Sequence, residues 1–184
     1  MESQAKTNKR YVLLDRDGTI ILNMHYQKNP AITQLLPNAR EGLEKLLDAG
    51  FGLVMVTNQS GVGRGLMKKE DAEAVNESVS TKLGEGRKWF DAVYYCPHVE
   101  EDGCDCRKPL PGMALQAAKE LSFSLGDAFV VGDREADINL GKAIGSRTVL
   151  VRTDDGAKTE KAGKCSPDYV ADDLLDAAEW ILAQ

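Results

Sequence analysis

The chain has 184 residues, of which 42% are hydrophobic and 28% charged, and its formal net charge is −6. This length and apolar content predict a single domain over residues 1–184 whose core needs no disulfides. The acidic balance argues against nucleic acid or an anionic membrane as partners, because binding them needs an excess of Lys and Arg. Residues 1–9 are polar and predict a flexible lead rather than a secretory signal, so we expect a cytoplasmic protein. We also expect a monomer.

Short apolar runs alternate with helical patterns along the chain. This alternation predicts a three-layer α/β/α, Rossmann-like fold with a mostly parallel sheet. The segment 154–166 is polar and predicts a mobile loop. Strands are expected at 11–15, 51–57, 90–95, 128–131, 148–151 and 169–170, and helices at 37–50, 68–83, 111–126, 135–143 and 172–182.

Two carboxylates follow the first predicted strand. Asp15 ends the apolar run, and Asp17 comes two residues later, just before Gly18. A carboxylate at a strand end can attack phosphorus and form an aspartyl-phosphate, while a second one can act as general acid and then general base. A solvated Asp-rich turn is the alternative for such a motif alone. A calcium loop fits poorly because no glutamate follows at the required spacing.

Further polar groups follow the second strand and precede the fourth. Because ligands bind outside the carboxyl ends of parallel strands, we expect Thr57 and Lys108 to meet Asp15 there. The Thr57 hydroxyl and the Lys108 ammonium would contact phosphoryl oxygens, and Arg107 would clamp a second anion. Taken singly, Thr57 is an ordinary strand-end residue and Lys108 an ordinary surface residue. Their combination favours phosphoryl transfer.

A magnesium site is expected at the same edge. Asp133 follows the fourth predicted strand and would bind Mg²⁺ together with Asp15 and the backbone carbonyl of Asp17. Asp137 would orient these groups. The alternative for Asp133 alone is a helix N-cap.

Three of the four cysteines lie close together with a histidine. Three thiols and one imidazole match a tetrahedral structural Zn²⁺ site, although the one-residue spacers are tighter than usual. The alternative is a set of buried cysteines beside a surface histidine. Arg107 follows the last cysteine directly, so zinc would fix the segment that carries it. The expected ligands are Cys96, His98, Cys104 and Cys106, which leaves Cys165 as a free thiol.

At these residues the chain resembles the haloacid dehalogenase (HAD) superfamily of aspartate-nucleophile phosphatases. The four motifs of that superfamily match Asp15 to Thr19, Thr57, Lys108, and Asp133 with Asp137. The likeness runs from about residue 10 to residue 182, within the zinc-containing, histidinol-phosphatase-like branch. It implies an essentially capless, open site in which Asp15 is the nucleophile, Asp17 the proton donor, Mg²⁺ the catalytic ion and Zn²⁺ a structural one.

The same resemblance implies a substrate and its contacts. We expect removal of the 7-phosphate of a heptose 1,7-bisphosphate, a small sugar bisphosphate used in lipopolysaccharide precursor synthesis. Histidinol phosphate is the first alternative substrate, and a non-enzymatic zinc-stabilised module that binds phosphorylated metabolites is the second alternative function. The implied contacts are Asn23, Met24, His25, Tyr26, Thr57, Asn58, Gln59, Ser60, Arg107, Lys108 and Arg134.

Overall fold

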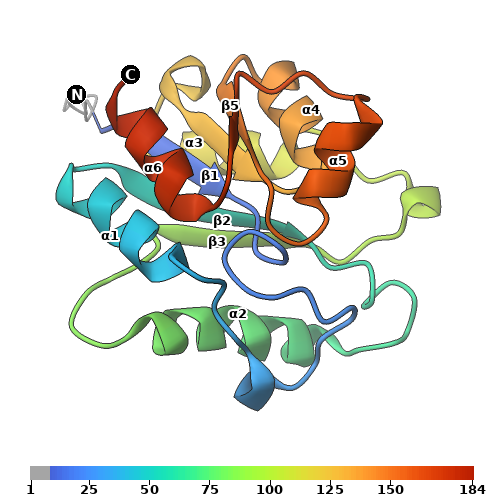
Figure 1. Cartoon of the computed structure of the whole chain (residues 1–184). Helices are drawn as coiled ribbons and strands as arrows, with labels where there is room; N and C mark the ends of the chain where they lie inside the picture. Colours follow the sequence, from blue (N-terminus) through green and yellow to red (C-terminus); the bar gives the residue numbers. More distant parts are fainter. Residues whose placement is uncertain (1–8) are drawn as a thin grey trace, which may run out of the picture.

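Six parallel strands form one sheet in the computed structural model of the chain, which describes residues 9–184. The strand order is β3-β2-β1-β4-β5-β6, and each predicted strand is confirmed with small shifts at its ends. Figure 1 labels β1, β2, β3 and β5 of this sheet. Apart from Lys9, the expected flexible lead falls outside the described residues. The strands are β1 Tyr11–Leu14, β2 Gly52–Asn58, β3 Ala92–Cys96, β4 Phe129–Gly132, β5 Arg147–Val151 and β6 Tyr169–Ala171.

The central strands are buried on both faces. In β1, Val12 and Leu14 pack into one hydrophobic cluster, whereas Tyr11 and Leu13 pack into another on the opposite face of the sheet. Successive side chains of a strand point to opposite faces, so a continuous apolar run suits a strand covered on both sides. The sheet therefore lies between two helical layers.

Helices cover both faces of the sheet, which confirms the three-layer prediction. Side chains of α1, α2 and α6 belong to the first cluster, and those of α3 and α4 to the second. Figure 1 shows α1 beside α6, and a Cβ on Gly42 of α1 would meet the carbonyl oxygen of Leu174 at 2.5 Å. The helices are α1 Ala39–Asp48, α2 Lys69–Leu83, α3 Gly112–Leu121, α4 Glu135–Ala143, α5 Gly156–Ala162 and α6 Leu174–Leu182.

The segment 154–166 is not the loop that its polarity predicts, because it contains α5. Gly156 is the only buried residue of this helix, so no apolar period exists that could reveal it. Two contacts fix the helix to β5. A Cβ on Gly156 would meet the carbonyl oxygen of Val151 at 1.7 Å, and Arg152 donates to both carboxylate oxygens of Glu160 at 2.8 and 2.9 Å.

The order of the strands reverses between β1 and β4. From β1 the chain builds outward to β2 and β3, and from β4 it builds outward on the other side to β5 and β6. The backbone N–H of Asp15 donates to the carbonyl of Val131 at 3.0 Å, which extends the β1–β4 pairing to the end of both strands. Ligand crevices of open α/β sheets lie at such a reversal. Among residues 9–184, no helix is long and apolar enough to cross a membrane.

Candidate active site

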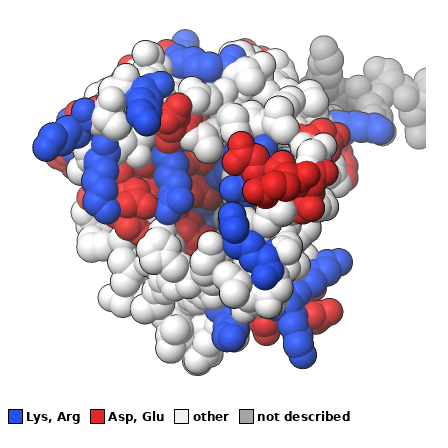
Figure 2. Space-filling view, turned by 90° about the vertical axis from the view of Figure 1, so that its right-hand side faces the viewer, with Lys and Arg blue, Asp and Glu red and all other residues white. Residues whose placement is uncertain are grey.

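A cavity of about 250 Å³ opens at the carboxyl ends of β1, β2 and β4. The loops after β2 and β3 lie at the right of Figure 1, and Figure 2 views this side. It shows Lys and Arg side chains next to Asp and Glu side chains rather than a surface of one charge. The cavity is lined by Asp15, Arg16, Asp17, Asn23, His25, Tyr26, Thr57, Asn58, Gln59, Ser60, Gly61, Arg107, Lys108, Arg134, Ala136 and Asp137.

A buried lysine joins two carboxylates beneath this cavity. The Lys108 Nζ donates to Asp15 Oδ1 at 2.7 Å, to Asp137 Oδ1 at 2.6 Å and to the carbonyl of Val56 at 2.8 Å. Burial alone would lower the pKa of Lys108, but Asp137 and Asp15 outweigh it, and the pKa lies above its ordinary value. The lysine therefore stays charged and fixes Asp15 at the strand end.

Asp133 is a fully buried carboxylate, and neither of its oxygens has a hydrogen-bond partner among residues 9–184. Burial raises its pKa to about 9, with further increases from Asp15 and Asp137. Asp15, Asp133 and Asp137 each place one carboxylate oxygen within 4.8 Å of those of the other two. A buried charge of this kind is costly unless a cation pairs with it. Gly18, at φ +83°, leaves room for Asp133, since a Cβ there would meet Asp133 Oδ2 at 2.3 Å.

Asp17 is fixed by two neighbours that the sequence patterns did not assign to it. Arg16 is 1% exposed and donates to Asp17 Oδ1 and Oδ2 at 3.1 Å each, while its Nη1 donates to Asn76 at 2.7 Å. The Gln59 Nε2 donates to Asp17 Oδ2 and to Thr57 Oγ1, both at 2.8 Å. Gln59 thus links Asp17 with Thr57, and Asp17 faces the cavity in one orientation.

The segment with Arg107 and Lys108 is positioned by Asn58. The Asn58 side chain donates to the Lys108 carbonyl at 3.1 Å and accepts the Lys108 N–H at 3.0 Å, so both ends of its amide are engaged. The Arg107 Nη1 donates to the His98 carbonyl at 3.4 Å. Asn58 lines the cavity, and its polar atoms fix the Lys108 backbone.

The loop with Asn23 to Tyr26 closes one side of the cavity. His25 and Tyr26 have φ of 37° and 54°, and the His25 N–H donates to Asn23 Oδ1 at 3.1 Å. The Asn23 N–H in turn donates to Asp154 Oδ2 at 3.1 Å. Met24 is 39% exposed and, unlike its three neighbours, does not line the cavity.

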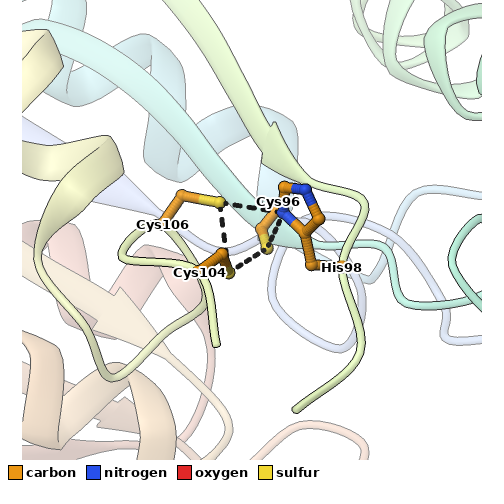
Figure 3. A group of neighbouring side chains, drawn as sticks. All are labelled: Cys96, His98, Cys104 and Cys106. Atoms are coloured by element: carbon orange, nitrogen blue, oxygen red, sulfur yellow. Dashed lines mark hydrogen bonds between the residues drawn. The ribbon is translucent and has the colours of Figure 1, made fainter. Parts of the chain in front are cut away.

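The four expected zinc ligands lie together beside this site (Figure 3). Cys104 Sγ lies 3.6 Å from Cys96 Sγ and 3.5 Å from Cys106 Sγ, and His98 Nδ1 lies 3.6 and 3.4 Å from the sulfurs of Cys96 and Cys106. Zinc–sulfur bonds of about 2.3 Å in a tetrahedron require sulfur–sulfur edges of about 3.8 Å. The arrangement therefore matches a closed tetrahedral site.

Arg16, Asp154 and Asp155 are among the residues of the site that escaped the sequence patterns. The position of Arg16 between two predicted catalytic carboxylates, directly after an apolar strand, was a usable signal. Asp154 and Asp155 lie in the segment predicted to be a loop, and no local pattern connects them to the cavity.

Known proteins share this architecture and sequence. A HAD-hydrolase-like family model matches residues 105–177. The chain is 37% identical to the D-glycero-beta-D-manno-heptose-1,7-bisphosphate 7-phosphatase of Pasteurella multocida, over 94% of this chain and 97% of that protein. The enzyme of the same name from Yersinia pestis is 36% identical, over 94% of this chain and 95% of that protein. The chain belongs to this family of HAD phosphatases.

Solved structures agree with the membership. The crystal structure of D,D-heptose 1,7-bisphosphate phosphatase from B. bronchiseptica, complexed with magnesium and phosphate, has a TM-score of 0.84 at 32% identity. It covers 95% of this chain and 98% of that one. A HAD-like phosphatase structure from Mesorhizobium loti has a TM-score of 0.77 at 30% identity, over 98% and 91% of the two chains. The predicted superfamily, fold class and phosphatase activity are thereby confirmed.

Proposed function

We propose that this HAD phosphatase removes the 7-phosphate of a D-glycero-D-manno-heptose 1,7-bisphosphate through an aspartyl-phosphate on Asp15. The observation that carries the chemistry is the pairing of Asp15 with the buried Lys108, at 2.7 Å, on the floor of an open cavity beside the unpartnered Asp133. The substrate rests on the names of relatives that match this chain over nearly its whole length.

In the first step, an Asp15 carboxylate oxygen bonds to phosphorus while the bond from phosphorus to the sugar oxygen breaks. Asp17 gives its proton to that leaving oxygen. In the second step, Asp17 takes a proton from water, and the hydroxide displaces Asp15 from phosphorus to release inorganic phosphate. The contacts of Asp17 with Arg16 and Gln59 support this role, because they hold its carboxylate toward the cavity.

A magnesium ion fits the carboxylate group. Asp15, Asp133 and the backbone carbonyl of Asp17 would hold it, and Asp137, bonded to Lys108 and to the Arg134 N–H, would orient the set. The bound ion would neutralise charge on the transferring phosphoryl group. Its fit rests on the two unpartnered oxygens of Asp133 and on the raised pKa of that carboxyl.

A structural zinc ion fits the cysteine–histidine cluster. Cys96, His98, Cys104 and Cys106 would hold it with no position open to substrate. Arg107 follows the last ligand and donates to the His98 carbonyl, so zinc would fix this guanidinium at the rim of the cavity.

The remaining contacts would bind the substrate. Arg107 and Arg134 line the cavity and would take the second phosphate, while Thr57 and Lys108 lie near the reacting one. The residues at 23–26 and 58–60 would contact the sugar. All of these groups come from one chain, so the proposed site needs no residue from a partner subunit.

Steady-state kinetics on two substrates tests the assignment. We expect kcat/KM for heptose 1,7-bisphosphate to exceed that for histidinol phosphate by at least about 100-fold, because only the bisphosphate carries a second anion for the two arginines. A higher kcat/KM for histidinol phosphate would contradict the substrate and leave the phosphatase chemistry intact.

A further inference from the structure

The turn between β5 and α5, residues 153–155, makes three separate contacts with the site. The Thr153 hydroxyl donates to the Gly18 carbonyl at 2.6 Å, and Asp154 accepts the Asn23 N–H at 3.1 Å. Asp155 accepts a hydrogen bond from Arg134, the residue at the start of α4. Asp154 adopts a left-handed conformation at φ 50°, which is uncommon for a residue with a side chain. This turn is therefore built onto the site, although no sequence motif marks it.

Asp155 stands at the N-cap of α5 but does not cap it. An aspartate at this position ordinarily accepts a backbone N–H of the first turn, yet Asp155 makes no such hydrogen bond. Its Oδ2 accepts from Arg134 Nη2 at 2.8 Å, and its Oδ1 accepts from Lys158 Nζ at 2.9 Å. The carboxylate is therefore bonded to Arg134 and to the Lys158 side chain instead of a backbone N–H of α5.

Arg134 lies between two carboxylates and is hydrogen-bonded to only one of them. Its Nη2 is bonded to Asp155, while its Nε lies 3.9 Å from Asp133 Oδ2, too far for a hydrogen bond. Asp133 is fully buried and its oxygens have no hydrogen-bond partner among residues 9–184. The Arg134 side chain is 48% exposed, so without the Asp155 contact it would have room to rotate toward them. Guanidinium and carboxylate form a strong paired contact at about 2.8 Å. A small rotation would close that gap and cover the oxygens that a cation needs.

We propose that Asp155 is a positioning residue that holds the Arg134 guanidinium off Asp133 and so keeps this carboxylate open to a divalent cation. The same contact points Arg134 into the cavity, where a substrate anion would meet it. The inference deepens the proposed function, because it concerns the magnesium site on which that function depends.

The test is the Mg²⁺ dependence of the full chain after Asp155→Ala. The rise of the melting temperature with Mg²⁺ concentration reports binding without turnover. In the variant we expect the apparent Kd for Mg²⁺ to rise about 5- to 20-fold, with a matching rise in the Mg²⁺ concentration that gives half-maximal hydrolysis of p-nitrophenyl phosphate. Asp155→Glu, which keeps a carboxylate for Arg134, should restore most of the affinity.

Two further variants separate this role from a general loosening of the turn. Removing the competitor with Arg134→Ala in the Asp155→Ala background should return the Mg²⁺ affinity to within about twofold of wild type. Lys158→Ala is the matched control, since it removes the other partner of Asp155 and leaves the Arg134 contact, and it should change nothing.

Two outcomes overturn the proposal: unchanged Mg²⁺ affinity in Asp155→Ala, or a loss that Arg134→Ala does not reverse. Neither binding nor p-nitrophenyl phosphate hydrolysis involves the heptose. A failure of the substrate assignment would therefore appear in the kinetic comparison alone.

Discussion

Two groups of potential metal ligands lie at the same end of the sheet and differ in origin. The cysteine–histidine cluster comes from eleven consecutive residues, 96–106, and its four donor atoms all lie near one another. The carboxylate group takes Asp15 from the end of β1, and Asp133 and Asp137 from beyond β4, more than 100 residues later. The cluster depends on a local loop, whereas the carboxylate group depends on the whole fold.

The two groups also differ in whether all of their potential ligand atoms have a hydrogen-bond partner. In the cluster each donor atom has a partner within the group, but both oxygens of Asp133 lack a hydrogen bond. A closed set of ligands suits a structural ion, and an open buried charge suits chemistry. Arg107 and Lys108 follow Cys106 directly, so this short segment joins the cluster to the lysine that pairs with Asp15 and Asp137.

The largest expected effect is the loss of turnover on Asp15→Asn. An amide cannot form the phosphorylated intermediate, so kcat should fall by at least about 10³-fold. Circular dichroism should show an unchanged fold, because the amide oxygen still accepts from Lys108. Asp48→Asn, at an exposed carboxylate, is the control and should keep full activity. Retained turnover in Asp15→Asn would remove the nucleophile from the mechanism.

Next in size is Lys108→Met, which should damage both activity and stability. It leaves Asp15 and Asp137 buried without their cation, and breaking a buried pair in this way costs about 3–5 kcal/mol of unfolding free energy. Urea denaturation measures the loss, and added Mg²⁺ should recover part of it. Lys69→Met, on the exposed face of α2, serves as the control. Equal stability of the two variants would mean that Lys108 does not neutralise the carboxylates.

Cys104→Ser should lower stability more than it lowers catalysis, because it removes a ligand of the cysteine–histidine cluster and leaves the carboxylate group intact. We expect bound zinc, measured by elemental analysis, to fall from about one ion per chain to near zero. The melting temperature should fall by about 4–8 °C, corresponding to about 2 kcal/mol, and kcat by no more than about tenfold. Cys165→Ser should leave zinc content and melting temperature unchanged. A wild-type protein without zinc would contradict the site.

A further expected effect is a pH dependence of the metal-free protein. The fold raises the pKa of Asp133 to about 9, so it favours the protonated carboxyl. The contribution of this protonated carboxyl to the free energy of unfolding is complete below about pH 4 and is lost progressively as the pH rises toward 9. Urea midpoints in EDTA, between about pH 5 and pH 8.5, should therefore decline, and Asp133→Asn should flatten this trend. The same decline in Asp133→Asn would assign it to another group.

Much of the site was predictable because its signals are local. Asp15 and Asp133 each follow an apolar run, and the rules for parallel sheets bring such strand ends together. The proximity of the four side chains of the cluster was predictable for a similar reason, since they share one short segment.

The remainder depends on long-range contacts or on loop geometry. Arg16 is buried because Asn76, on a helix 60 residues away, accepts from its guanidinium. Met24 does not line the cavity although its three neighbours do, and the backbone of His25 and Tyr26 is left-handed, which their side chains do not require. The α5 helix has no apolar face, so a search for apolar periodicity cannot detect it.

The hydrogen bond from the Asp15 N–H to the Val131 carbonyl has a wider consequence. It ties the two strand ends through main-chain atoms, so the gap between Asp15 and the Asp133 carboxylate follows from strand register rather than from the identity of core side chains. Exchanges among aliphatic residues beneath the site can therefore accumulate and cost some stability, while the spacing of the reactive groups persists. A single-residue insertion in β1 or β4 would have the opposite result: it would shift that spacing even where every side chain of the site is retained.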